Sequence, residues 1–123
     1  MKKLLQIVLV SSLSLLCFSC YYDEFTEEIV TEIPDDQTVS FSVDIEPIFT
    51  KCTGCHGTNI SPDLREGYAY NSLVPSFVTA GDADGSRLYN YLPGNGHHEI
   101  GLTLSGNEIA LIKAWINQGA LDN

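Results

Sequence analysis

The sequence predicts a small, mostly α-helical domain built from short helices and long loops. Its clearest helix covers residues 105–119, where apolar side chains recur at helical spacing behind a helix-start signal. No segment alternates apolar and polar residues over a sustained run, as a half-buried strand does. A chain of 123 residues allows one domain of this kind.

The first nineteen residues are predicted to be an export signal of the lipoprotein type. Lys2 and Lys3 give it a positive start, and the apolar stretch over residues 4–16 is short for a membrane span. Ser19 precedes Cys20 as a small residue does at a bacterial lipoprotein processing site, so we expect Cys20 to carry the lipid. The alternatives are simple cleavage nearby, with Cys20 as a free thiol, and an uncleaved anchor helix.

Residues 20–38 are predicted to form an acidic, flexible tether. The stretch 21–38 has seven acidic residues and no basic one, and like charges keep such a segment extended and solvated. The alternative is a peripheral strand whose apolar side chains, such as Ile33, pack on the domain.

The charge of the exported chain limits its partners. The whole sequence has 6 basic and 16 acidic residues, and the leader holds two of the lysines and no acid, so the exported chain has a formal charge of −12. Nucleic acid is therefore not an expected partner, because its phosphates would be repelled. A partner protein with a basic docking surface is compatible with this charge.

The domain is expected over residues 39–123 and to begin with a short helix over 42–49. Ser42 or Asp44 is the predicted N-cap, with a start near Asp44, because Pro47 is tolerated only in a first turn. The helix would have an apolar face formed by Ile45, Ile48 and Phe49.

Directly after this helix comes Cys52-Thr53-Gly54-Cys55-His56, a C-x-x-C-H run that is typical of covalent haem attachment. The two thiols can reach the two vinyl groups on one edge of a haem. The following His56 can then supply the proximal nitrogen, because imidazole is a common ligand of haem iron. A domain of roughly 85 residues also needs a staple, and a bound haem would supply one.

Other readings of the same residues remain open. A zinc site would use the two thiolates with His97 and His98, although adjacent histidines are a poor chelating pair. A thioredoxin-like redox pair would need a βαβ unit, and none is visible in the sequence. A disulfide between Cys52 and Cys55 would close a loop of two residues and add little stability.

The rest of the domain reads as turns and two further helices. Residues 57–71 are predicted to form a loop, and residues 81–86 are predicted to form a turn. A short helix should follow, with Asp84 or Ser86 as its N-cap, and it should end at the turn-forming residues 93–96. Its inward side chains would be Leu88, Tyr89 and Leu92, while Tyr68, Tyr70 and Leu73 would cover one side of the cysteine site.

The last helix begins with a capping box, in which Ser105 is the N-cap and Glu108 the third helical residue. Gly119 is a plausible residue for its C-terminal end. Its apolar side is predicted to consist of Ile109, Ile112, Trp115 and Ile116.

In this order the elements resemble a small class I c-type cytochrome domain, in particular the single-haem domains of bacterial lipoproteins. The matching pieces, over about residues 41–121, are Ile45-Glu46-Pro47-Ile48-Phe49, the C-x-x-C-H run, Ala80-Gly81-Asp82, Ser86-x-Leu88, Leu104-Ser105, Glu108-Ile109 and Trp115-Ile116-x-x-Gly119-Ala120. The resemblance implies a class I cytochrome c-like fold wrapped around one haem c. Cys52 and Cys55 would form the thioethers, and His56 would be the proximal iron ligand.

The sequence departs from this family at the distal ligand. A Met before the last helix usually binds the iron there, but Ile100 stands near that place, and the only Met, Met1, is lost with the leader. His98, closer to Ile100, is the preferred candidate for the distal ligand, and His97 is the second. The remaining alternative is that both histidines are solvated and the iron is five-coordinate or water-bound.

The sequence thus predicts an exported, lipid-anchored electron carrier in the periplasm or on the outer face of a bacterial membrane, with redox proteins as partners. It is not expected to be an enzyme, although weak peroxidase-like activity stays open. Two alternative functions are a haem-based ligand sensor with an open sixth site and an interaction lipoprotein stapled by zinc.

Overall fold

The structure is a computed structural model that describes residues 1–3, 6 and 32–123. Cys20, residues 20–31 of the predicted tether and most of the predicted export signal lie outside the described residues. Within the described part, the chain is mostly helical and has no strand, as predicted. None of the helices in that part has the length and apolar character needed to cross a bilayer. The helical segments are η1 (Phe41–Ile45, a π-helix), α2 (Glu46–Phe49), α3 (Ala69–Leu73), α4 (Arg87–Asn90) and α5 (Gly106–Asn117).

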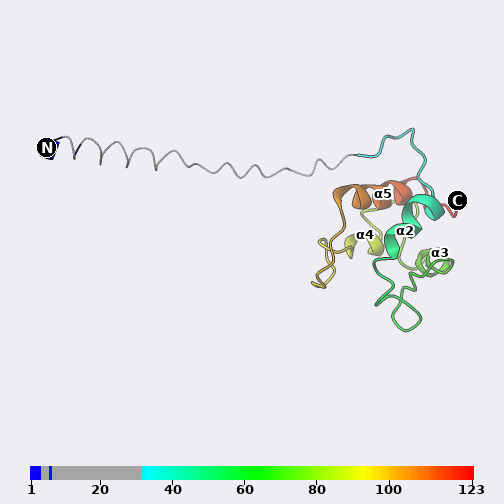
Figure 1. The fold of residues 1–123 in the computed structure, drawn as a ribbon. Coiled ribbons are helices and arrows are strands. Elements are labelled where there is room, and N and C mark those ends of the chain that lie inside the picture. The colour runs from blue at the N-terminus through cyan, green and yellow to red at the C-terminus, as the bar shows by residue number, and fades with distance from the viewer. Residues whose placement is uncertain (4–5, 7–31) are drawn as a thin grey trace.

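The longest helix, α5, lies along one side of the domain, and α4 and α3 lie below it in the view of Figure 1, on either side of α2. It begins at the predicted capping box: the Ser105 hydroxyl accepts from the Glu108 amide, and the Glu108 carboxylate accepts from the Ser105 amide. It ends before Gly119, whose φ of 106° suits a glycine at the residue after the C-cap. The helix buries Ile112, Trp115 and Ile116 and half-buries Ile109, so its predicted apolar side is confirmed.

The first helical run starts earlier than the sequence suggested. Its N-cap is Ser40, not Ser42 or Asp44, and the Ser40 hydroxyl accepts from the Val43 amide at 3.3 Å. In return the Asp44 carboxylate accepts from the Ser40 amide at 2.8 Å, so the acid supports the cap instead of being one. Pro47 lies in the first turn of α2, as predicted.

Three aromatic rings from η1, α3 and α5 form the centre of the core. The Phe41 ring lies 5.2 Å from the Trp115 ring and 5.2 Å, edge-on, from the Tyr70 ring. The Trp115 indole N–H donates to the Leu121 carbonyl at 2.9 Å, so the buried ring leaves no polar atom unpaired. Ile45, Ile48 and Phe49 are all buried in the same cluster, which confirms the predicted apolar face.

The beginning and the end of the domain are hydrogen-bonded to each other. The Asn123 side chain accepts from the Phe41 amide at 2.8 Å, and the Asn123 main-chain oxygen accepts from the Ser42 amide at 3.0 Å. Gln118 bonds both the Val39 amide and the Gln37 carbonyl, each at 2.9 Å. Ile33 is half-buried against the core, so the last residues of the predicted tether lie on the domain.

Two short helices differ in detail from the sequence reading. The α3 helix starts inside the predicted 57–71 loop, because Ala69 and Leu73, one turn apart, are both fully buried. Tyr68 is exposed and does not cover the site, whereas Tyr70 is half-buried.

Ser86 is the N-cap residue of α4, but its hydroxyl makes no capping bond to that helix. Instead it donates to the Asp82 carbonyl at 2.7 Å and accepts from the Thr79 amide at 2.8 Å. This fully buried serine therefore closes the turn before the helix. Leu88 and Leu92 point inward as predicted, and Tyr89 is only half-buried.

The segment after α2 is joined to the start of α5 by an ion pair. The Lys51 ammonium contacts the Glu108 carboxylate, which also serves the capping box. Burial, the largest single effect, raises the pKa of Glu108, but the hydrogen bonds from Lys51 and Ser105 together outweigh it and leave the pKa lowered. The charged form of Glu108 is thus favoured by folding.

Ile112→Val tests the packing of α5. Ile112 is fully buried, so removing one methylene should lower the free energy of unfolding by about 1 kcal/mol, measured by chemical denaturation. Val43→Ala is the control, because Val43 is 72% exposed and the change should stay within about 0.5 kcal/mol. Equal effects of the two substitutions would contradict the assigned core.

Glu108→Gln tests the ion pair through its pH dependence. At neutral pH it should lower the free energy of unfolding by about 0.5 kcal/mol, because the partly exposed pair is lost while glutamine can still serve the capping box. Since folding lowers the pKa of Glu108, this stabilisation is complete above the unfolded value of about 4.3 and disappears as pH falls through the folded pKa. Wild type and variant should therefore converge in acid. Glu66→Gln, at an exposed acid with no ion pair among the described residues, should show no such convergence.

Candidate functional site

The C-x-x-C-H run forms a tight turn at the end of α2. The Cys52 amide donates to the Phe49 carbonyl at 2.8 Å, which extends the helix. The Cys52 carbonyl then accepts from the Cys55 amide at 3.1 Å and from the His56 amide at 2.9 Å. Residues three and four apart on a helical turn lie on one side of it, so Cys52, Cys55 and His56 share a side of this turn.

The two cysteines are free thiols with different exposure. Cys52 is half-buried and Cys55 is exposed. Burial, the main cause, raises the pKa of the Cys52 thiol, and Glu108 and Cys55 raise it further against the opposing effect of Lys51. Redox-active cysteines have lowered pKa values, so this environment disfavours the thioredoxin-like alternative.

The His56 imidazole has an unsatisfied buried nitrogen. Its Nδ1 is buried and has no hydrogen-bond partner among the described residues. Leaving such a group unpaired costs about 1–3 kcal/mol, so the ring is suited to a partner that the protein itself does not provide. The main chain of His56 is firmly held, because its carbonyl accepts from the Leu64 amide at 2.9 Å.

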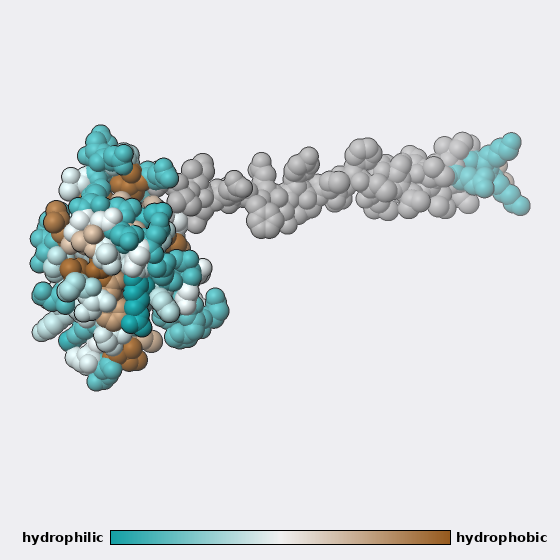
Figure 2. Space-filling model, turned by 180° about the vertical axis from the view of Figure 1, so that it is seen from behind, coloured by the Kyte–Doolittle hydropathy of each residue, from teal (hydrophilic) through white to brown (hydrophobic). Residues whose placement is uncertain are grey.

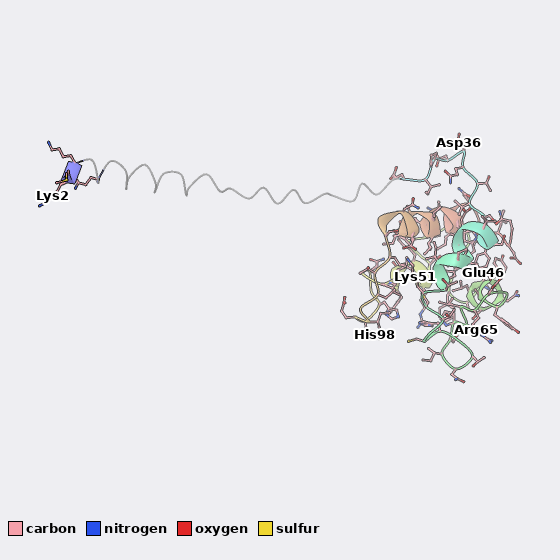
Figure 3. The ribbon with its side chains drawn as sticks, in the orientation of Figure 1. Lys2, Asp36, Glu46, Lys51, Arg65 and His98 are labelled. Atoms are coloured by element: carbon pink, nitrogen blue, oxygen red, sulfur yellow. The ribbon has the colours of Figure 1, made fainter. Side chains whose placement is uncertain are left out.

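A second histidine lies beside this ring. The centroids of the His56 and His97 rings are 6.1 Å apart, and the His97 ring bonds through Nδ1 to the His98 carbonyl at 2.8 Å. His98 is exposed and stacks on His97, with ring centroids 4.5 Å apart (Figure 3 shows His98 on the loop between α4 and α5). The structure thus brings His97, and not the preferred candidate His98, next to His56.

These residues fit a haem better than a zinc ion. Across residues 1–3, 6 and 32–123, no three side chains of the His, Cys, Asp and Glu types are grouped closely enough to hold a metal ion. The zinc alternative therefore lacks a ligand set in this arrangement. Two free thiols followed by an imidazole with a buried unpaired nitrogen match the needs of a covalently held haem.

Three residues that support the site were not identified from the sequence as part of it. Lys51 and Glu108 join the cysteine turn to α5, and Gly96 precedes the histidine that approaches His56. The position of Lys51 next to Cys52 was visible in the sequence, but its partner lies 57 residues further along the chain. No local pattern links such distant residues.

On the face of the molecule shown in Figure 2, apolar side chains appear as separate areas among hydrophilic ones. A shallow cavity of about 270 Å³ is lined by none of the predicted site residues. Its lining consists of Asp35, Thr38, Val39, Trp115, Gln118, Leu121 and Asn123.

Comparison of the chain with protein-family models, with curated proteins and with solved structures found no match. Function is therefore inferred from the chain's own residues and their arrangement.

Proposed function

We propose that this chain is an exported, membrane-tethered c-type cytochrome that carries single electrons between redox partner proteins. The observation that carries the proposal is the turn formed by Cys52, Cys55 and His56. It presents two free thiols and an imidazole with a buried, unpaired nitrogen in the order that covalent haem attachment requires.

Each residue of the turn has one role in this proposal. Cys52 and Cys55 hold the haem through thioether bonds, and His56 binds the iron from the proximal side. When bound, haem supplies a one-electron iron couple. The protein's part is to attach and orient the group, and no set of side chains at the site has the spacing of a general acid and base. We therefore propose an electron carrier and not an enzyme.

The surroundings of the turn support a fixed orientation. The Lys51–Glu108 pair ties the start of the turn to α5, and the bond from the Leu64 amide holds the His56 main chain. Side chains supported by helices and hydrogen bonds keep a site's geometry better than side chains on free loops. This support suits a carrier whose haem must stay in one position while the electron moves.

The proposal includes a class I cytochrome c-like arrangement of the helices. A short helical run precedes the C-x-x-C-H turn, long loops with two short helices follow, and α5 completes the domain. This element order agrees with the resemblance that the sequence suggests, and the aromatic contact between Phe41 and Trp115 joins its first and last helices.

The location and partners follow from the N-terminal region and the charge. A lipid on Cys20 would hold the domain at the periplasmic or outer face of a bacterial membrane, and the acidic residues between Cys20 and Ile33, which packs on the domain, would give it reach. An acidic exported chain favours redox partners with basic docking surfaces and disfavours nucleic acid.

Cys52→Ser combined with Cys55→Ser tests the proposal. The full-length protein is produced in a host that attaches c-type haem, then acid-denatured and extracted with organic solvent, and the absorption of the polypeptide is recorded. Wild type should retain its haem, and the double variant should retain none, because neither cysteine of the C-x-x-C-H turn is left to form a thioether.

Thr53→Ala is the matched control for this experiment. Thr53 lies between the two cysteines, and its hydroxyl donates to the Thr50 carbonyl at 2.9 Å, so the variant should keep covalent haem. A colourless wild-type polypeptide would refute the proposed function. Haem that stays attached to the double variant would refute the assignment of the thioethers.

A further inference from the structure

We propose that His97 is the second axial ligand of the iron, which makes the site a bis-histidine centre. This inference rests on the proposed haem site and adds the identity of the sixth ligand. The sequence alone does not decide between the adjacent His97 and His98, and this inference selects His97. It also excludes an iron whose sixth coordination position has no protein ligand.

The separation of the two rings carries the first part of the inference. Two imidazoles that bind one metal ion from opposite sides, with metal–nitrogen distances of about 2 Å, have ring centroids roughly 6 Å apart. The centroids of His56 and His97 are 6.1 Å apart. Within the described chain, the His56 ring contacts the His97 ring and not the His98 ring. The exposed His98 ring stacks on His97 instead.

The hydrogen bond of the His97 ring carries the second part. Its Nδ1 lies 2.8 Å from the His98 carbonyl oxygen, which can only accept. The Nδ1 atom is therefore the protonated one, and in the neutral ring Nε2 holds the free lone pair. A ligating histidine commonly donates its other N–H to a backbone carbonyl in this way, which fixes the tautomer and the ring orientation.

Hydrogen bonds within the protein hold the loop that presents His97. The Leu92 carbonyl accepts from the amides of Asn95 at 2.9 Å, Gly96 at 3.3 Å and His97 at 3.4 Å. The Asn95 side chain adds a bond to the Tyr89 carbonyl at 3.0 Å. Because Leu92 is itself buried, these bonds fasten the loop to the core at the end of α4.

Gly96 is a positioning residue within this loop. A Cβ atom there would lie 2.3 Å from the Asn90 carbonyl oxygen, a distance that real Cβ atoms do not reach. The obstacle is main chain, so it cannot turn aside as a side chain could. Any larger residue at this position must push the loop, and the adjacent His97, away from its present place.

Two imidazole ligands have consequences for the carrier. With both histidines bound to the iron, small molecules would reach it only after one of the two imidazoles leaves. They should also give a lower reduction potential than His/Met ligation, because a Met ligand raises it. The restricted access to the iron favours electron transfer over ligand sensing.

The test compares His97→Ala with His98→Ala in the full-length haem-loaded protein. Ferric absorption and electron paramagnetic resonance spectra report the spin state, and carbon monoxide binding to the ferrous form reports access to the iron. We expect wild type and His98→Ala to be low-spin and slow to bind carbon monoxide. His97→Ala should be high-spin and bind carbon monoxide readily, and added imidazole should restore its low-spin spectrum.

Gly96→Ala provides a second variant that leaves both histidines in place. It should convert part of the protein to the high-spin form while covalent haem is retained. Either a high-spin wild type or a low-spin His97→Ala protein would overturn the assignment of His97. If His97→Ala is low-spin and His98→Ala is high-spin, the ligand is His98.

Failure of this inference and failure of the proposed function give different results. Haem that remains on the denatured wild-type polypeptide keeps the cytochrome assignment whatever the spin state, so a high-spin spectrum then rejects His97 alone. A wild-type polypeptide without covalent haem rejects both.

Discussion

The carbonyl of Cys52 fixes the main chain of the candidate site. By accepting from the amides of Cys55 and His56, it turns five consecutive residues into one helical turn, which places both thiols and the imidazole on the same side of that turn. The turn keeps its place because it continues α2, whose apolar side is buried, and because Lys51 is paired with Glu108 at the start of α5. The capping box of α5 therefore serves the helix and the site at once.

Local signals allowed the prediction of some elements, and contacts between distant residues decided the others. The start of α5 depends on Ser105 and Glu108, three residues apart, so the sequence shows it directly. The start of η1 depends on Ser40, which is also bonded to the main-chain oxygen of Asn123, 83 residues away. No short pattern announces such a bond, and the predicted cap was accordingly placed too late in the chain.

The same difference separates the two halves of the candidate site. Cys52, Cys55 and His56 are contiguous, so their spacing alone indicates their chemistry. The choice between His97 and His98 depends on how the loop after α4 folds back on the Leu92 carbonyl, and proximity to Ile100 along the chain does not report it. The close approach of Gly96 to Asn90 is equally invisible in the sequence, because any glycine could serve an ordinary turn.

The proposed ligand pair also bears on how a domain this small is held together. His56 lies in the first half of the domain and His97 in the second, on a loop fastened to α4. A group bound by both would join segments that are far apart in sequence, and it would bind the folded chain in preference to the unfolded one. Its binding would thus add stability to a core that, in roughly 85 residues, is marginal by size alone. In this proposal the residues that set the electronic properties of the iron are also the residues that close the fold around it.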